Sequence, residues 1–357
     1  MDNSTVSTEK TPTRIDWDLV QKAYTLSLVV YCVAFVLGPI GNGLVIYVTG
    51  CRINKTVNSV WFLNLAIADF LFTSLLLLYI INISRGFNWP FGDTMCKLNS
   101  MVTVLNMFAS IFLLVTISLD RCLSTLWVVW AQNKRTPRKA EVICVGIWLA
   151  SLACSMPYTV IRETSVYNYT TLCQYNKDIT GSTHIKLIVF RFLLGFLIPF
   201  LVIIGCYIAI AVRASRLRRG INRKSFRIIV AIVLTFFICW MPFHVIQFLE
   251  YEKIPGLEMV FDIGIPLSSS LAFFNSCLNP ILYVFMCDEF QTKLRKSVLL
   301  VFENAFAEDH GMSFMSSTRS LSSHLSRISR RSESGASGQD TTTSLVTRSN
   351  IQVATKV

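Results

Sequence analysis

Seven long apolar segments constrain this chain more than any other feature of its sequence. They run at roughly 24–50, 58–84, 94–126, 141–162, 184–212, 225–250 and 259–286. A membrane-spanning helix needs about 20 mostly apolar residues. Because lipid offers the backbone no hydrogen-bond partner, continuous apolar segments must be helical, and they lack the alternation over about ten residues that marks a β-barrel strand. The sequence therefore predicts an all-α integral membrane protein, a seven-transmembrane helix bundle over residues 24–287.

The composition excludes a soluble protein. Of the 357 residues, 53% are hydrophobic and only 15% are charged, whereas a soluble domain carries about 25% charged residues. The sequence contains no HExxH, GxSxG or P-loop motif, and GPIGNG at 38–43 lies inside a predicted span, where it cannot cradle a phosphate. We therefore expect no enzyme. A membrane transporter is a distant alternative, disfavoured because the two halves show no inverted repeat.

The charges of the connecting loops predict the orientation. Loops 51–57, 127–140 and 213–227 are basic and contain no acid, whereas the loops on the other side mix both signs. The positive-inside rule places the basic loops in the cytoplasm, so the N-terminus lies outside and the C-terminus inside. The net charge of +12 is then mainly a topology signal, and no nucleic-acid binding is expected.

The two ends of the chain differ from its centre. Residues 1–23 are polar and form an extracellular tail. Residues 288–304 predict an amphipathic helix on the inner leaflet, because apolar side chains recur at four-residue spacing at Phe290, Leu294, Val298 and Phe302. The Ser/Thr-rich residues 305–357 carry too little apolar surface to fold and predict a disordered cytoplasmic tail. This tail is either simply solvated or, as we favour, a phosphorylation substrate.

Four residues on the predicted outer side are candidates for covalent modification. Asn3 and Asn168 each begin an Asn-X-Ser/Thr sequon and are expected to be glycosylated. Cys96, at the outer start of the third span, and Cys173, in the loop before the fifth, are the only cysteines placed in the oxidising outer space. A disulfide between them is expected, the alternative being two unpaired thiols.

Polar and charged side chains inside the spans indicate functional sites. Asp69, near the centre of the second span, must find a proton, a cation or hydrogen-bond donors, so it marks either a sodium or proton site or a packing network. Arg191 lies roughly 10 Å from the outer end of the fifth span by helix rise. Its guanidinium stays charged. It either snorkels to the outer surface or lies in a water-filled cavity, where its fork would suit a carboxylate.

Prolines interrupt several of the spans. Pro157, Pro199, Pro242 and Pro280 each remove a backbone hydrogen bond and can kink a helix. Trp240 stands two residues before Pro242. It is either ordinary core filling or part of a helix that opens by pivoting on the kink.

Motifs in separate spans resemble those of the rhodopsin-like (class A) G-protein-coupled receptors over about 24–304. They are GNGLV at 41–45, LNLAIAD at 63–69, WPFG at 89–92 followed by Cys96, DRC at 120–122, Trp148, Pro199 with Tyr207, FFICWMP at 236–242 and NSCLNPILY at 275–283. Within that family the chain is most similar to the chemoattractant branch, above all to the chemerin and formyl-peptide receptors. The passages at 55–72, 191–199 and 270–286 carry this similarity.

The resemblance implies roles for individual residues. A sodium pocket would comprise Asp69, Ser110, Asn275 and Asn279. Asp120 would hold Arg121 at rest, and Tyr207 and Tyr283 would close on Arg121 in the active state. The remaining parts of the activation switch would be Ile111, Pro199, Phe236, Trp240, Pro242 and Pro280. Arg191 matches an arginine that meets a peptide carboxylate, and the ligand would also contact Thr103, Met107, Phe243, Gln247 and Ser269.

The sequence departs from the family pattern at several positions. The third residue of the Asp-Arg-Tyr motif is Cys122, as is usual in this branch. Val104 replaces an aspartate of the formyl-peptide receptors, which disfavours recognition of a formyl-methionyl peptide. No acid stands at the start of the sixth span, so Arg121 lacks a second ionic partner there.

The resemblance implies a plasma-membrane receptor for an extracellular chemoattractant peptide or small protein, similar to chemerin. It implies signalling through inhibitory-class heterotrimeric G proteins and arrestin, with phosphorylation by receptor kinases. The alternatives are a receptor of the same branch for a lipid mediator, and an arrestin-biased scavenging receptor. No cofactor is expected apart from a possible sodium ion.

Overall fold

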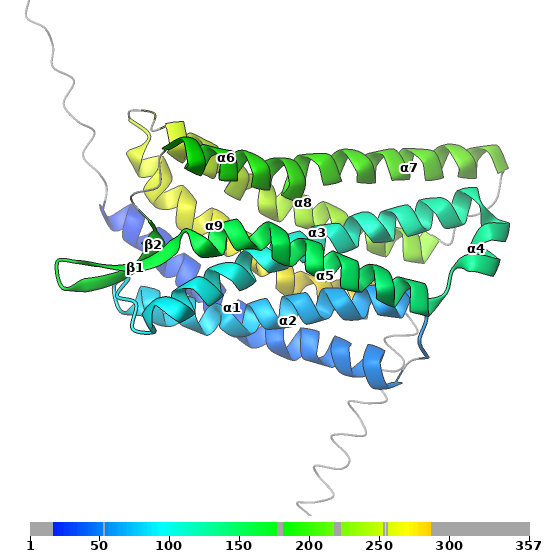
Figure 1. Cartoon of the computed structure of the whole chain (residues 1–357), viewed down its shortest axis with the longest axis horizontal. Helices are drawn as coiled ribbons and strands as arrows, with labels where there is room; N and C mark the ends of the chain where they lie inside the picture. Colours follow the sequence, from blue (N-terminus) through cyan, green and yellow to red (C-terminus); the bar gives the residue numbers. More distant parts are fainter. Residues whose placement is uncertain are drawn as a thin grey trace, which may run out of the picture. The chain divides into compact units, whose positions relative to one another are not determined.

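The computed structural model describes residues 17–52, 54–176, 181–217, 223–252, 254 and 256–286. Three sequence-based predictions lie outside these residues: the sequon at Asn3, the amphipathic helix at 288–304 and the tail at 305–357. Within the described residues the chain forms a bundle of long helices (Figure 1).

Each of the seven predicted segments forms a helix, so the predicted fold class is confirmed. The helices, with two π-helical stretches η1 and η2, are α1 (Trp17–Tyr47) with η1 (Val48–Arg52), α2 (Val57–Ser84), α3 (Gly92–Leu126), α5 (Pro137–Val160), α6 (Gly181–Phe192) continued by η2 (Leu193–Leu197) and α7 (Ile198–Leu217), α8 (Arg223–Glu252) and α9 (Glu258–Met286).

Capping residues fix several of the helix ends. Thr56 caps α2: its Oγ1 accepts from the Ser59 amide at 3.1 Å, and the Ser59 Oγ accepts from the Thr56 amide at 2.8 Å, which is a capping box. Pro137 stands in the first turn of α5, where its missing N–H costs no hydrogen bond. The helix α1 begins at Trp17 rather than near Tyr24, because a helix can extend beyond the lipid into water, where polar residues such as Asp18 and Lys22 are tolerated.

Six of these helices are long and apolar enough to cross a membrane: α1 with η1, α2, α3, α5, α6 with η2 and α7, and α8. The helix α9 has 29 residues and is more polar, since it carries Ser268, Ser269, Ser270, Asn275, Ser276 and Asn279. It packs between α1 and α8. Buried side chains line the helix interfaces, and the exposed apolar side chains of α1, α5 and α7 face outward, where lipid would contact them.

Close helix contacts are made by small and polar residues, as is usual in membranes. A Cβ added to Gly38 of α1 would lie 2.6 Å from the Cβ of Thr73 in α2, so only glycine fits there. The Asn42 side chain donates to the carbonyl oxygens of Gly38 and Ser276, each at 3.0 Å, and links α1 to α9.

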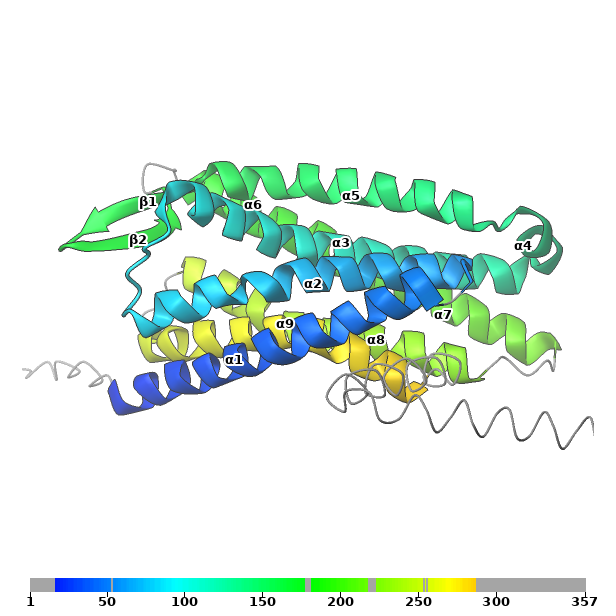
Figure 2. The same cartoon turned by 90° about the horizontal axis from the view of Figure 1, so that it is seen from below.

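Two elements were not predicted from the sequence. A β-hairpin of β1 (Arg162–Tyr167) and β2 (Thr170–Tyr175) pairs Thr164 with Cys173. A short helix α4 (Val128–Lys134) follows α3. Figures 1 and 2 show the hairpin at the same end of the bundle as the start of α1, and α4 at the other end.

Candidate functional site

The hairpin is held over the start of α3 by several bonds. The predicted disulfide between Cys96 and Cys173 is present and joins α3 to β2. The Thr164 amide donates to the Asp93 side chain at 3.0 Å, and the Trp89 amide donates to the Thr171 carbonyl at 2.7 Å. The sequon residue Asn168 lies at the exposed turn of the hairpin, with a positive φ of 45° that asparagine tolerates.

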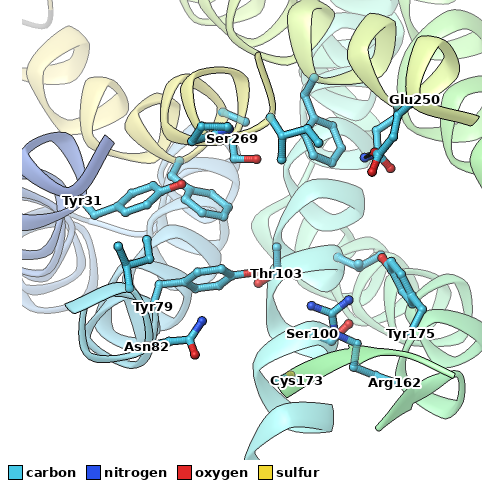
Figure 3. Close-up of a pocket in the computed structure, with 18 of the residues that line it drawn as sticks. Tyr31, Tyr79, Asn82, Ser100, Thr103, Arg162, Cys173, Tyr175, Glu250 and Ser269 are labelled. Carbon is cyan, nitrogen blue, oxygen red and sulfur yellow. Dashed lines mark hydrogen bonds between the residues drawn. The ribbon is translucent and has the colours of Figure 1, made fainter. Parts of the chain in front are cut away.

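A cavity of about 380 Å³ lies beneath the hairpin. Five of the six residues expected to contact a ligand line it: Thr103, Arg191, Phe243, Gln247 and Ser269. These side chains come from α3, α6, α8 and α9, which are distant in sequence. Figure 3 shows Thr103 and Ser100 on one side of this space and Ser269 and Tyr31 on the other.

Met107 does not line the cavity, contrary to expectation. It is fully buried one turn further along α3, and its Cε lies 2.8 Å from where a Cβ would stand on Gly195. Gly195 belongs to η2, and its lack of a side chain admits the methionine. Met107 therefore packs in the core of the bundle.

Arg191 is the most unusual group of the cavity. Its residue is only 5% exposed, so it does not snorkel to the surface. Its Nη2 donates to the Gln247 Oε1 at 2.6 Å, and its guanidinium lies 4.8 Å from the centre of the Phe243 ring. Its Nε has no hydrogen-bond partner among the described residues, and no described carboxylate forms an ion pair with it. A buried cation without a direct ion pair is unfavourable, so the cavity favours an anionic guest.

Further polar groups of the cavity were not predicted. Arg162 of β1 stacks over the Tyr175 ring at 4.5 Å, and Figure 3 shows both beside the cavity. Glu250 lies across the cavity and accepts from the Gln247 amide at 3.2 Å. The sequence placed Arg162 in an outer loop of mixed charge, and only the hairpin brings it over the cavity. Two arginines against one glutamate leave the lining positive.

A buried polar cluster surrounds Asp69, which is 0% exposed. The Asn279 Nδ2 donates to the Asp69 Oδ2 at 2.7 Å. When the Asn106 side-chain amide is flipped, its nitrogen donates to the Asp69 Oδ1 at 3.2 Å. Its oxygen then accepts from the Ser276 hydroxyl at 3.1 Å. The Ser110 hydroxyl lies 3.5 Å from the same amide group. The sequence-based set included Ser110, Asn275 and Asn279 but not Asn106 or Ser276.

The donor chemistry of this cluster fits a monovalent cation. One carboxylate would balance a single positive charge, and hydroxyl and amide oxygens are ligands that hard cations prefer. The amide oxygens of Asn275 and Asn279 are buried and have no hydrogen-bond partner among the described residues, so both could coordinate a cation. Asp69, Ser110, Asn275 and Asn279 are the residues that would hold it.

The residues expected to form the activation switch lie below the cavity. Trp240 lines the cavity floor, and its ring lies 5.8 Å from that of Phe236. Ile111, Phe236 and Trp240 belong to one continuous buried cluster. Pro199 is buried in α7, and Pro242 and Pro280 lie inside α8 and α9. The Tyr283 side chain lies outside the described residues.

At the opposite end of the bundle Asp120 forms its ion pair with Arg135, and the pairing with Arg121 expected for the resting state stays a prediction. Both Asp120 oxygens accept instead from Arg135, each at 2.7 Å, and Arg135 also donates to the Asn58 side chain at 2.6 Å. Arg135 follows α4 and its planar fork satisfies the whole carboxylate. The Arg121 Nε has no hydrogen-bond partner among the described residues. Tyr207 packs beside Cys122, Cys206 and Ile210.

Comparison with known proteins gives consistent results. The family model described as "7 transmembrane receptor (rhodopsin family)" matches residues 41–283. Chemerin-like receptor 1 of Homo sapiens is 41% identical over 303 residues, covering 80% of this chain and 81% of that protein. The C3a anaphylatoxin chemotactic receptor of Danio rerio is 42% identical over 299 residues, covering 84% and 82%. Formyl peptide receptor 2 of Mus musculus is 38% identical over 317 residues, covering 84% and 90%.

Proposed function

This chain belongs to the rhodopsin family of seven-transmembrane receptors, and on that premise we propose that its ligand is an extracellular chemoattractant peptide or small protein, similar to chemerin. The chain is a multi-pass receptor of the plasma membrane, from the chemoattractant branch, and it is not an enzyme. Receptors of this family couple extracellular ligands to heterotrimeric G proteins.

The observation that carries the proposal is the buried guanidinium of Arg191 at the cavity. It has one neutral hydrogen-bond partner, Gln247, and lies between aromatic rings. The terminal carboxylate of a peptide could accept two parallel hydrogen bonds from this fork, which a hydroxyl or amide could not. Arg162 adds a second positive charge at the cavity rim. A peptide entering by its C-terminus accounts for both charges.

The ligand acts by biasing one rearrangement of the helices. A guest in the cavity contacts Phe243 and Trp240 on α8, on either side of Pro242. Trp240 packs on Phe236, so a displaced indole moves the buried core below it. At the far end of the bundle, the G protein binds the arrangement in which Arg121 is accessible. Both partners favour the same helix arrangement, so their binding is coupled.

We propose the orientation from the charges of the loops, and the remaining partners from the resemblance to the chemoattractant branch. The hairpin end, with the sequon at Asn168, faces outward, and the end carrying Arg121 and the basic loops faces the cytoplasm. The receptor signals through an inhibitory-class G protein, and receptor kinases phosphorylate the Ser/Thr-rich tail to recruit arrestin.

A panel of ligands tests this proposal. Peptides with free C-terminal carboxylates, chemerin and complement fragments among them, and lipid mediators with a carboxylate are each added to cells that express the receptor. G-protein activation and arrestin recruitment are recorded in parallel. We expect a peptide or small protein to activate both pathways. A response to lipid mediators alone would contradict the peptide assignment, and arrestin recruitment without G-protein activation would indicate a scavenging receptor.

We predict that the Asp69→Asn substitution removes the sodium dependence of agonist affinity. In the unchanged receptor, replacing potassium by sodium at constant ionic strength should weaken agonist binding about fivefold, a usual size for coupling between two sites. The neutral asparagine cannot balance a cation. The measurement is agonist affinity in membranes in both salts, with Asp262→Asn, near the start of α9, as the control. Sodium dependence that persists in Asp69→Asn would remove the ion site from this account.

A further inference from the structure

A second hollow lies at the end of the bundle opposite the hairpin. It is an open groove of about 640 Å³ between the end of α3 and the end of α7, close to α4. Among the described residues, those that line it are Leu126, Trp127, Ala209, Val212, Arg213 and Arg216. Leu126 and Ala209 pack against the cluster of Cys122, Cys206 and Ile210, and the described lining combines two cations with otherwise apolar side chains.

The two arginines of the groove form no ion pair within the described part of the chain. The buried Nε of Arg213 has no hydrogen-bond partner among the described residues. The sequence contains no acid between Arg121 and Ala140, nor anywhere in α7. Two adjacent guanidinium groups without a carboxylate would be stabilised by an anion that spans both.

The apolar part of the groove continues along the outside of α7. Leu201, Ile204, Ile208 and Val212 are exposed and recur every three or four residues, which places them on one face of the helix. Arg216 follows Val212 by one turn on the same face. The face therefore runs as an apolar stripe for about 16 Å by helix rise and ends at a cation.

Exposed aromatic and apolar side chains continue from the groove residue Trp127 into the short helix α4. Trp127 and Trp130 are exposed, and Val129 is 71% exposed. Exposed tryptophans at a bundle end are typical of the boundary between lipid and water. The groove therefore lies at the depth of the phospholipid headgroups, with its apolar stripe extending towards the bilayer centre.

We propose that this groove binds one anionic phospholipid of the cytoplasmic leaflet. The phosphate oxygens accept hydrogen bonds from Arg213 and Arg216, and an acyl chain lies along the stripe from Val212 to Leu201. The apolar stripe and the paired cations match the two ends of a phospholipid, whereas a soluble phosphate would use only the cations. The inner leaflet supplies anionic lipids, and the positive-inside rule predicts that this end of the bundle faces it.

Native mass spectrometry of the purified full-length receptor tests the site. The probe is phosphatidylserine, titrated in detergent beside phosphatidylcholine. We expect one tightly bound phosphatidylserine, with its affinity reduced about tenfold in the double variant Arg213→Gln/Arg216→Gln. The matched control is Arg138→Gln/Lys139→Gln, which removes the same charge from exposed positions of α5 outside the groove. Equal losses in both variants, or none in either, would overturn the proposal.

Two further measurements distinguish a bound lipid from a bound anion and from a loss of fold. Excess inorganic phosphate should displace little of the bound phosphatidylserine, because it cannot use the apolar stripe. Displacement by phosphate alone would show an anion site without a lipid site and would contradict the proposal. The melting temperatures and agonist affinities of both double variants should match those of the unchanged receptor. A variant that fails this check is replaced by Arg213→Lys/Arg216→Lys, which keeps the charge, loses the planar forks and should bind the lipid with intermediate affinity.

Discussion

Substituting Arg191 by alanine is expected to raise the agonist concentration for half-maximal response about 100-fold, because truncating one partner of a buried charge pair costs about 2–5 kcal/mol. The guanidinium is 5% exposed and forms no direct ion pair with a described carboxylate, so a ligand carboxylate would supply its direct counter-charge. Surface expression should persist, since the remaining partner, Gln247, is uncharged: its Nε2 already donates to Glu250, and its Oε1 can accept from water. The measurement is agonist potency in a G-protein activation assay at matched receptor density.

The control for this prediction is Arg85→Ala, which removes an arginine from the exposed end of α2, outside the cavity. Amidation of the ligand's C-terminus should lower agonist potency strongly at the unchanged receptor. It should lower potency very little at the Arg191→Ala variant, because the two changes remove the same charge pair. Additive losses from the two changes would show that Arg191 does not meet the carboxylate. Unchanged potency in Arg191→Ala would remove the arginine from the ligand site.

Substituting Arg135 by alanine is expected to slow agonist-stimulated nucleotide exchange about tenfold, equivalent to about 1.4 kcal/mol. Arg135 occupies both oxygens of Asp120, which prevents Asp120 from holding the neighbouring Arg121. Without Arg135, the carboxylate is left partly buried and would recruit Arg121 as its partner. Arg121 is then withheld from the G protein. Exchange is measured on purified receptor with saturating agonist.

Two further variants refine the Arg135 prediction. Arg135→Lys keeps the charge but cannot reach both carboxylate oxygens and Asn58 with one planar group. Its nucleotide exchange rate should therefore lie between those of Arg135→Ala and the unchanged receptor. Arg138→Ala removes a neighbouring exposed charge and should leave the exchange rate unchanged. Faster exchange in Arg135→Ala would show that Arg135 restrains the receptor, contrary to this account.

The sequence predicted the residues that stand out because they lie in, or on a known side of, a membrane-spanning segment. Asp69 and Arg191 stand out because polar groups are costly inside a span, and the structure buries both. The Cys96–Cys173 disulfide followed from the assignment of outer and inner loops. The helices extend a few residues beyond most predicted ends. The apolar stretch of the sequence marks only the part of a helix that lies in lipid, and the helix can continue into water, as α1 does at Trp17.

Residues whose roles depend on loop conformation were missed. Arg162 reaches the cavity only because β1 folds over α3, and nothing in a loop of mixed charge predicts that hairpin. Arg135 belonged to a basic run that reads as a topology signal, and its fork on Asp120 depends on where α4 ends. Met107 was expected to contact the ligand, but it packs against Gly195 of η2. This close contact cannot be deduced from helix spacing.

The central claim is that the outer cavity and the inner end of the bundle bias one helix rearrangement, and reciprocity tests it most directly. Agonist affinity is measured on purified receptor in nanodiscs, with and without a nucleotide-free inhibitory-class G protein. Because coupling between two sites acts equally in both directions, the G protein should raise agonist affinity by about fivefold to 150-fold. Agonist affinity that is unchanged by every heterotrimer, while agonist remains bound in the cavity, would contradict the account.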